Sequence, residues 1–407
     1  MALEIPSWLN NQFIERILKK SENDDSIRVV NIVTKPATNK GDNYTSQMYR
    51  TTANFMRHQG SKQITDKKSL IIKTTLPDGP NNNLVQEAGL FDIEIKMMTN
   101  TLRDMESLLK DKKLAGKCYY TQDANPVMLV IEDLAPLGFR MADRQAGLDL
   151  EHCMLAISGI AKFHAGSVAA CEKEPKYKEQ YHKGIFNSSH PKEMKRFFIG
   201  GMKGLASVMK NWTDVDQQYA DKMMSVAEVS YDRASDSTIL DDNEFHVINH
   251  GDYWVNNMLF RYDNEGKVID HILVDFQLCL YGSPAIDLSY FFNTSPSEEV
   301  LQKYYDKLIN EYLTILSATM KKIGCKTSPP TLADLKKSLN QKEIYGFVAA
   351  CTILPIVLVD KADAQNLEEI LGDDESPFNN KAYMNPAYER AICRRLPNWN
   401  RLGLLDA

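Results

Sequence analysis

The sequence lacks paired cysteines, a hydrophobic run of membrane-spanning length and a basic, apolar leader at its start. Its seven cysteines are scattered, and no two are spaced as CxxC or CxxxC, so neither a disulfide framework nor a zinc site is predicted. The longest apolar stretch, residues 345–359, contains Gly346 and Pro355 and is shorter than the roughly 20 residues that a membrane helix needs. These absences predict a reduced, cytoplasmic protein without a membrane span.

An excess of basic charge is also missing. The chain carries 48 Lys+Arg against 54 Asp+Glu, which gives a formal net charge of −6. No nucleic-acid partner is therefore expected, and an anionic ligand must be held by a local site. With 43% apolar and 25% charged residues in 407, the composition is that of a soluble globular chain. The length predicts two or three domains, or one enzyme built from lobes.

Hydrophobic patterning divides the chain into a strand-rich first part and a helical remainder. Short β-branched segments predict strands at residues 27–33, 44–54, 67–75, 117–121 and 127–131, with one helix at 84–110. Longer periodic segments predict helices at 147–167, 191–209, 214–232, 297–323 and 332–359. Three short strands, at 245–249, 257–262 and 268–275, interrupt these helices. We therefore expect an α+β fold with a small β-rich N-lobe at residues 1–135 and a larger, mostly α-helical C-lobe at 136–407.

The inserted strands carry the residues that point to chemistry. His250, Gly251 and Asp252 are followed five positions later by Asn257, and Asp275 lies 23 residues after Asp252 in the sequence LVDFQ. Either half alone is usually a turn or a strand end. Together they match the pattern H-G-D-x-x-x-x-N followed by D-F, in which one carboxylate acts as a base while an amide and a second carboxylate hold Mg²⁺. The pattern predicts phosphoryl transfer.

Phosphoryl transfer also requires a lysine on a strand and a glutamate on the following helix. Lys73 lies in the predicted strand SLIIKTT. Glu94 follows it by 21 residues, and Glu87 lies seven residues earlier on the same helical face. We expect Glu94 to pair with Lys73 and keep Glu87 as the alternative.

The remaining nucleotide contacts are less distinctive in the sequence. A GxGxxG signature is absent, and the segment KGDNYTS offers Gly41, Asn43 and Ser46 as candidate phosphate-binding residues. At the end of the strand LVIEDL, backbone groups near Glu132 and Leu134 are candidates for binding an adenine edge. The equal alternative is that this segment is simply a strand leaving the sheet.

At this point the sequence resembles the ecdysteroid kinase-like (CHK kinase-like) family of insects and other invertebrates, which is related to choline kinases and aminoglycoside phosphotransferases. The resemblance rests on the segments PATNKGDNYTSQMYR, SLIIKTTLP, GLFDIEIKMM, LVIEDLAPLGFRMADRQAGLD, AKFHAGS and NHGDYWVNNMLFRYDNEGKVIDHILVDFQLCLYGSPAIDLSYFF. It implies a protein-kinase-like bilobal fold. Gln277 stands where protein kinases carry the glycine of Asp-Phe-Gly, which argues against a protein kinase.

The resemblance also implies roles for individual residues. Asp252 would be the catalytic base, Asn257 and Asp275 the Mg²⁺ ligands, Lys73 the phosphate-binding lysine and Glu94 its partner. His250 would brace the catalytic loop, and Asp287 would anchor it from the next helix.

Several aromatic residues and one histidine have two interpretations. His164 is more simply a buried, hydrogen-bonded histidine than a direct participant. Tyr253 and Trp254 either line an acceptor site or pack the loop, with packing favoured. The pairs 291–292 and 304–305 (FF and YY) either line an apolar acceptor pocket or, as is commoner at helical spacing, belong to the core.

Taken together, the sequence predicts an ATP- and Mg²⁺-dependent kinase that phosphorylates a hydroxyl of a lipophilic alcohol, such as an ecdysteroid or a xenobiotic. We expect a monomer whose partner is this small-molecule alcohol. One alternative is a nucleotide- or ligand-binding pseudokinase. Another is a choline- or ethanolamine-type kinase, which would need an aromatic and acidic cage for a cation.

Overall fold

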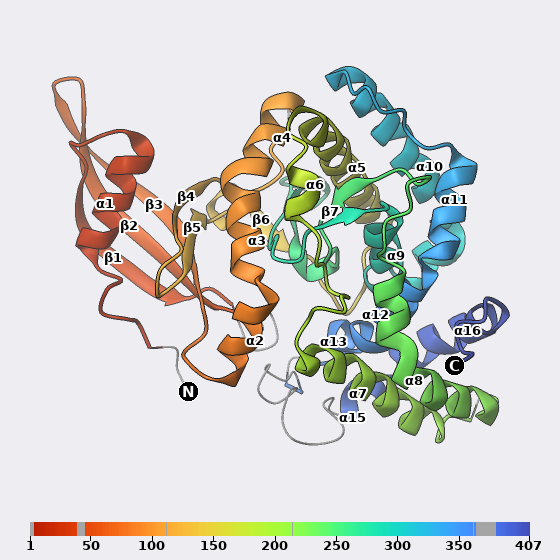
Figure 1. Cartoon of the computed structure of the whole chain (residues 1–407). Helices are drawn as coiled ribbons and strands as arrows, with labels where there is room; N and C mark the ends of the chain where they lie inside the picture. The colour runs from red at the N-terminus through yellow and green to blue at the C-terminus, as the bar shows by residue number, and fades with distance from the viewer. Residues whose placement is uncertain (1–3, 39–44, 111, 214, 361, 364–379) are drawn as a thin grey trace.

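An antiparallel sheet forms the N-terminal part of the chain, and helices form most of the rest (Figure 1). The structure is a computed structural model that describes residues 4–38, 45–110, 112–213, 215–360, 362–363 and 380–407. The sheet has the order β1-β2-β3-β5-β4 with all neighbours antiparallel. Its strands are β1 (Arg28–Pro36), β2 (Gln47–Gln59), β3 (Lys62–Thr74), β4 (Cys118–Gln122) and β5 (Met128–Glu132).

A helix that the sequence analysis did not predict packs on this sheet. Helix α1 (Asn11–Glu22) begins at Asn10, whose side chain accepts a hydrogen bond from the backbone N–H of Phe13. Its buried face forms a separate hydrophobic cluster with the inner side chains of the strands, among them Ile14, Leu18, Phe55 and Ile72. The burial of this face stabilises the sheet that carries Lys73.

The prediction of one continuous helix at 84–110 is wrong. The segment consists of α2 (Pro80–Ala88), α3 (Leu90–Lys96), a π-helical turn η1 (Met97–Thr101) and α4 (Leu102–Leu109). Gly89 ends α2 with a left-handed backbone at φ 74°, which a glycine adopts without a steric penalty. The break lets α3 turn independently of α2, and Figure 1 shows α3 and α4 beside the sheet, toward the helical part.

The C-terminal part is built from helices around two small sheets. The main helices are α5 (Leu150–Lys173), α6 (Tyr177–Gln180), α7 (Lys192–Met209), α8 (Gln217–Asp236), α9 (Ala285–Thr294), α10 (Glu298–Ile323), α11 (Leu332–Gln341), α12 (Glu343–Thr352), α13 (Leu354–Leu358), α15 (Asn380–Tyr383) and α16 (Pro386–Arg401). The sheets have the orders β6-β8-β9 and β10-β7. Their strands are β6 (Phe139–Met141), β7 (Val247–Asn249), β8 (Met258–Tyr262), β9 (Val268–Leu273) and β10 (Leu280–Gly282).

Helix α5 is the central core helix of this part. It packs against α10, α4, β9 and β7. By length and composition alone it is apolar enough to cross a membrane, but 78% of its most apolar window is buried inside the protein. Neighbouring helices and strands cover the apolar surface of α5. Packing inside the protein therefore already removes this surface from water.

Most helix predictions in this part are confirmed, and one is wrong. The N-terminus predicted at Ser297 is confirmed, because its side chain caps α10 by accepting the backbone N–H of Val300. The helix predicted at 214–232 is α8, although residue 214 itself lies outside the described residues. The single helix predicted at 332–359 is instead α11, α12 and α13, with breaks at Lys342 and Ile353.

The α+β class with a small β-rich part and a larger helical part is confirmed by this architecture. The lobe boundary near residue 135 stays a prediction. Strand β5 ends at Glu132, and a single 3₁₀ turn, η2 (Ala135–Leu137), leads from it to β6 in the second part.

Candidate functional site

The catalytic loop predicted around Asp252 connects β7 to the 3₁₀ turn η3 (Val255–Asn257). Gly251 has a left-handed backbone at φ 81°, and a Cβ atom placed there would lie 1.8 Å from the carbonyl oxygen of Leu278. A glycine is therefore required by both conformation and space. The His250 ring donates from Nε2 to the carbonyl oxygen of Val274 at 3.0 Å, which ties this loop to the end of β9.

Asp287 lies fully buried on α9 behind the loop. Its Oδ2 accepts the backbone N–H of His250 at 2.6 Å, and its Oδ1 accepts that of Gly251 at 2.8 Å. His164 contacts the same carboxylate through Nε2 at 3.0 Å and Tyr312 through Nδ1 at 2.8 Å. The expected buried, hydrogen-bonded His164 is thus what the structure shows. Asp287 lies where it can fix the loop backbone, as its expected anchoring role requires.

Asp252 is half-buried, and both of its carboxylate oxygens accept hydrogen bonds. Tyr290 donates its hydroxyl to Oδ1 at 2.8 Å, and Asn257 donates its Nδ2 to Oδ2 at 2.9 Å. The pKa of Asp252 is raised from 3.8 to about 7, mainly by burial and also by the nearby Asp275 carboxylate, although the hydrogen bonds from Tyr290 and Asn257 partly offset this rise. The carboxylate therefore titrates near neutral pH, where a general base works best.

Lys73 joins the two parts of the chain through buried charges. Its Nζ lies 2.7 Å from Oε2 of Glu94 on α3 and 2.6 Å from Oδ1 of Asp275, which follows β9. Burial alone would lower the pKa of Lys73, but the Asp275 and Glu94 carboxylates outweigh it and raise the pKa, so the ammonium stays charged. Glu87 is exposed on α2. The structure thus pairs Lys73 with Glu94 and not with Glu87.

A cavity of about 420 Å³ lies beside these residues. Its lining includes Lys73, Glu94, Asn257 and Asp275, together with Glu132 and Leu134 of the predicted adenine-edge segment. Apolar residues also line the cavity, among them Met48, Ile71, Ile131, Leu259 and Leu273. Such a lining suits a flat aromatic base held near a polar phosphate end.

The candidates in the loop before β2 are only partly described. Gly41 and Asn43 lie outside the described residues, and Ser46 is buried immediately before β2. Glu132 lines the cavity, although its carboxylate pairs with Lys113 and accepts the backbone N–H of Lys117 at 3.1 Å. Ser46 is thus the one loop candidate whose placement the structure gives, and Glu132 has its carboxylate occupied by protein groups.

Sequence reasoning missed three residues that the structure places at this site. Tyr290 contacts Asp252 from α9, one helical turn after Asp287, and its i, i+3 spacing from Asp287 is the sequence signal that could have identified it. Gln277 accepts the Thr45 hydroxyl at 3.0 Å and contacts Lys73 at 3.4 Å, and so connects the start of β2 to the buried charges. Arg50 also lines the cavity, and its Nε lies 2.9 Å from Oδ2 of Asp133. No sequence motif indicated this residue.

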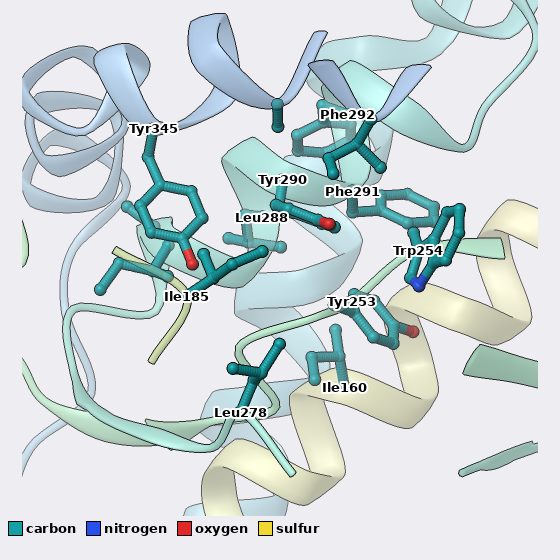
Figure 2. Packing of buried hydrophobic residues seen from close by; sticks show 14 of the residues in the cluster. Ile160, Ile185, Tyr253, Trp254, Leu278, Leu288, Tyr290, Phe291, Phe292 and Tyr345 are labelled. Carbon is teal, nitrogen blue, oxygen red and sulfur yellow. The ribbon is translucent and has the colours of Figure 1, made fainter. Parts of the chain in front are cut away.

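The aromatic residues of the loop and of α9 mainly pack the site. Tyr253 is fully buried and donates its hydroxyl to the carbonyl oxygen of Ala156 at 2.7 Å. Trp254, Phe291 and Phe292 are also buried, and Figure 2 shows them with Tyr253 in one cluster between α9 and α5. The packing interpretation therefore holds for these four residues.

The residues present fit a magnesium ion in their chemistry. Asn257 uses its amide nitrogen on Asp252, which leaves its oxygen without a hydrogen bond from the described residues. Asp275 has a left-handed backbone at φ 68°, and its second oxygen has only a long contact of 3.4 Å with Gln277. Among the described residues no group of three His, Cys, Asp or Glu side chains forms a closed metal site. Mg²⁺ typically binds one or two protein oxygens and completes its shell with phosphate and water.

Comparison with known proteins gives the family. The model of the ecdysteroid kinase-like family matches residues 40–325, which is most of the chain, and this protein belongs to that family. The chain is thus a small-molecule kinase-like protein, and the predicted kinase-like fold class is confirmed. No curated protein matches the sequence.

Two solved structures are similar to the chain at low identity. One is the GDP and kanamycin complex of APH(2″)-IIIa, with 9% identity, a TM-score of 0.40 and coverage of 82% of this chain and 89% of that one. The other is the GDP complex of wild-type aminoglycoside 2′-phosphotransferase-IIIa, with 9% identity, a TM-score of 0.37 and coverage of 87% and 99%. Likeness of this degree bears on neither the substrate nor the nucleotide of this chain.

Proposed function

We propose that this protein is an ATP- and Mg²⁺-dependent kinase that phosphorylates a hydroxyl group of a small lipophilic alcohol. The observation that carries the proposal is the convergence of Asp252, Asn257 and Asp275 with the buried Lys73–Glu94 pair beside one cavity. These groups come from segments up to 202 residues apart. A purely structural role does not explain why Lys73 meets two carboxylates, those of Glu94 and Asp275, at a cavity between the two parts.

In this proposal Asp252 orients the acceptor hydroxyl and accepts its proton. Tyr290 and Asn257 hold the carboxylate in place from opposite oxygens, and a remaining lone pair receives the substrate proton. Lys73, kept charged by its two carboxylate neighbours, offsets negative charge on the phosphates. Asn257 and Asp275 would hold the magnesium ion, which when bound neutralises charge on the phosphate oxygens.

The acceptor class follows from the family rather than from a described pocket. Ecdysteroids and related alcohols are the substrates that the family name suggests, and xenobiotic alcohols share their chemistry of a hydroxyl on an apolar body. We further propose a cytoplasmic location and a monomeric state. Cys118, Cys153, Cys171, Cys279, Cys325 and Cys351 are free thiols in the structure, which suits a reduced compartment.

The replacement Asp252→Asn tests the proposed reaction. We expect kcat to fall about 10²–10⁴-fold because the amide cannot accept the proton, while the affinity for Mg·ATP changes little. The measurement is phosphate transfer to a panel of steroid, xenobiotic and choline-type alcohols, followed by mass gain. Asp242→Asn, at an exposed position, is the matched control.

Three results would contradict the proposal in different ways. Full transfer by the Asp252→Asn variant would exclude Asp252 as the base. Tight Mg·ATP binding without transfer to any alcohol would favour a pseudokinase. Transfer to choline alone would replace the lipophilic acceptor by a cationic one.

A further inference from the structure

Gln277 is a buried amide at the candidate site to which the reaction above gives no role. It lies two residues after Asp275, and only 5% of its surface is exposed. It is not among the described residues that line the cavity, so any effect on a ligand must pass through its neighbours. Protein kinases carry a glycine at this place in the sequence Asp-Phe-Gly, and a glycine has no side chain with which to contact such neighbours.

The segment after β9 turns the side chain of Gln277 toward the buried charges. Phe276 is buried, and its ring lies 5.9 Å from that of Phe163 in the core. Its two neighbours both contact Lys73, Asp275 at 2.6 Å and Gln277 at 3.4 Å. Gln277 therefore belongs to the same cluster of polar groups as the proposed metal ligand.

The amide of Gln277 presents the correct polarity to each of its neighbours. Its Oε1 accepts the Thr45 hydroxyl at 3.0 Å and faces Nζ of Lys73 at 3.4 Å. Its Nε2 faces Oδ2 of Asp275 at 3.4 Å. A carboxylate could not donate to Asp275, and an apolar side chain could neither donate nor accept. A neutral amide is thus the group that suits this position.

The contact with Thr45 connects two distant parts of the chain. Thr45 lies directly before β2 and is 232 residues from Gln277 in the sequence. Ala37 and Thr38, which follow β1, line the cavity. Gln277 therefore holds the chain that leads into β2 against Lys73, the group to which the proposed reaction assigns the phosphates.

We propose that Gln277 is a positioning residue that fixes the chain before β2 against Lys73 and Asp275 for the binding of Mg·ATP. The inference rests on the proposed function and adds to it a residue that acts through Thr45 and the two charged groups. Loss of the amide is expected to weaken Mg·ATP binding because the chain before β2 is no longer held in place.

The test is calorimetric titration of the full chain with Mg·ATP. Gln277→Met keeps a long side chain without an amide, and we expect it to weaken binding about three- to tenfold, the range for one hydrogen bond. Thr45→Val removes only the hydroxyl and should weaken binding by no more than this. The double variant should match Gln277→Met, because both replacements remove the same hydrogen bond. Gln302→Met, at an exposed position of α10, is the matched control and should leave the affinity unchanged.

A second measurement detects the contact itself without nucleotide. Amide hydrogen exchange at residues 45–49 should be faster in Gln277→Met and in Thr45→Val than in the unaltered protein. Exchange within α10 should not change, which separates a local loss of this contact from a general loss of stability.

Three results would overturn the positioning role of Gln277. They are an unchanged Mg·ATP affinity in Gln277→Met, losses of affinity that multiply in the double variant, and unchanged exchange at residues 45–49. If the unaltered protein bound no Mg·ATP, the proposed function itself would fail, and the exchange measurement would still decide whether Gln277 holds the chain before β2.

Discussion

At the scale of single residues, burial and neighbouring charges together decide which groups carry protons at this site. Asp252 lies near Asp275, and both burial and that neighbour raise its pKa to about 7 from an ordinary value of 3.8. Lys73 shows the opposite balance, because two carboxylates keep it charged despite burial. The sequence identifies these residues by their spacing, but it does not give the distances that set their protonation.

The pH dependence follows from the raised pKa of Asp252. Transfer requires the ionised carboxylate, so kcat/KM should fall about tenfold per pH unit below pH 7. The contribution of Asp252 to the free energy of unfolding has the opposite pH dependence. The folded state binds the proton at a higher pH than the unfolded state does, so Asp252 makes unfolding harder as pH falls from about 7 toward 3.8.

Comparison of the Asp252→Asn variant with the unaltered protein measures this pH-dependent contribution to stability. Since Asn does not titrate, the melting temperature of the variant relative to the unaltered protein should be highest at pH 8 and decline toward pH 5. Melting curves across this range check the expectation. A constant difference would show that Asp252 does not titrate there.

Gly251 is a second residue-scale test. Gly251→Ala places a Cβ atom 1.8 Å from the carbonyl oxygen of Leu278 and also strains a backbone at φ 81°. Gly266 has a similar φ of 85° but no atom within 4 Å of its Cβ position, so Gly266→Ala isolates the backbone term of about 1–2 kcal/mol. We expect Gly251→Ala to cost at least about 2 kcal/mol more and to abolish transfer. Equal melting temperatures for the two variants would contradict this account of the loop.

At the scale of elements, short breaks in helices position the side chains of the candidate site. Periodicity predicts one helix over 84–110 because the apolar spacing continues through Gly89. The left-handed backbone at Gly89 instead separates α2 from α3, which buries Glu94 on α3 and leaves Glu87 exposed on α2. Two glutamates that share a face in a continuous helix are thereby separated.

The pair Glu94→Gln and Glu87→Gln tests this separation. Glu94→Gln removes a charge from the buried contact with Lys73 and should lower the free energy of unfolding by about 2 kcal/mol, with a loss of transfer activity. Glu87→Gln should change stability by less than about 0.5 kcal/mol, because it is exposed. Denaturant unfolding and transfer assays of both variants give the comparison. A larger loss of stability and activity in Glu87→Gln than in Glu94→Gln would favour Glu87 as the partner of Lys73.

At the scale of the whole molecule, the cavity joins the sheet-bearing part to the helical part. Lys73 on β3 contacts Asp275 beyond β9, so a ligand in the cavity contacts both parts at once. The order of elements along the chain predicts two such parts but not the groups that meet between them. The motifs in the sequence predict that Asp252, Asn257 and Asp275 belong to one site; in the structure Asn257 contacts Asp252, and Asn257 and Asp275 line the same cavity.

Binding across the two parts predicts ligand-dependent stability. Mg·ATP at about 100 times its dissociation constant should stabilise the protein by about 2.7 kcal/mol, measured as a rise in melting temperature. Removal of Mg²⁺ with EDTA should abolish most of this rise. Asp275→Asn, which removes a carboxylate from the proposed metal ligands, should show little difference between ATP with and without Mg²⁺. A full rise without Mg²⁺ would contradict the proposed metal site.

The sequence by itself determined the fold class and the family and predicted the candidate site residues, because strand and helix periods and motif spacing are local properties of the chain. Only the tertiary structure decided that Glu94 pairs with Lys73, that Tyr290 contacts Asp252 and that Gln277 contacts Thr45. Those features depend on breaks and close approaches between distant segments. Such contacts are set by packing, which hydrophobic periodicity along the chain does not specify.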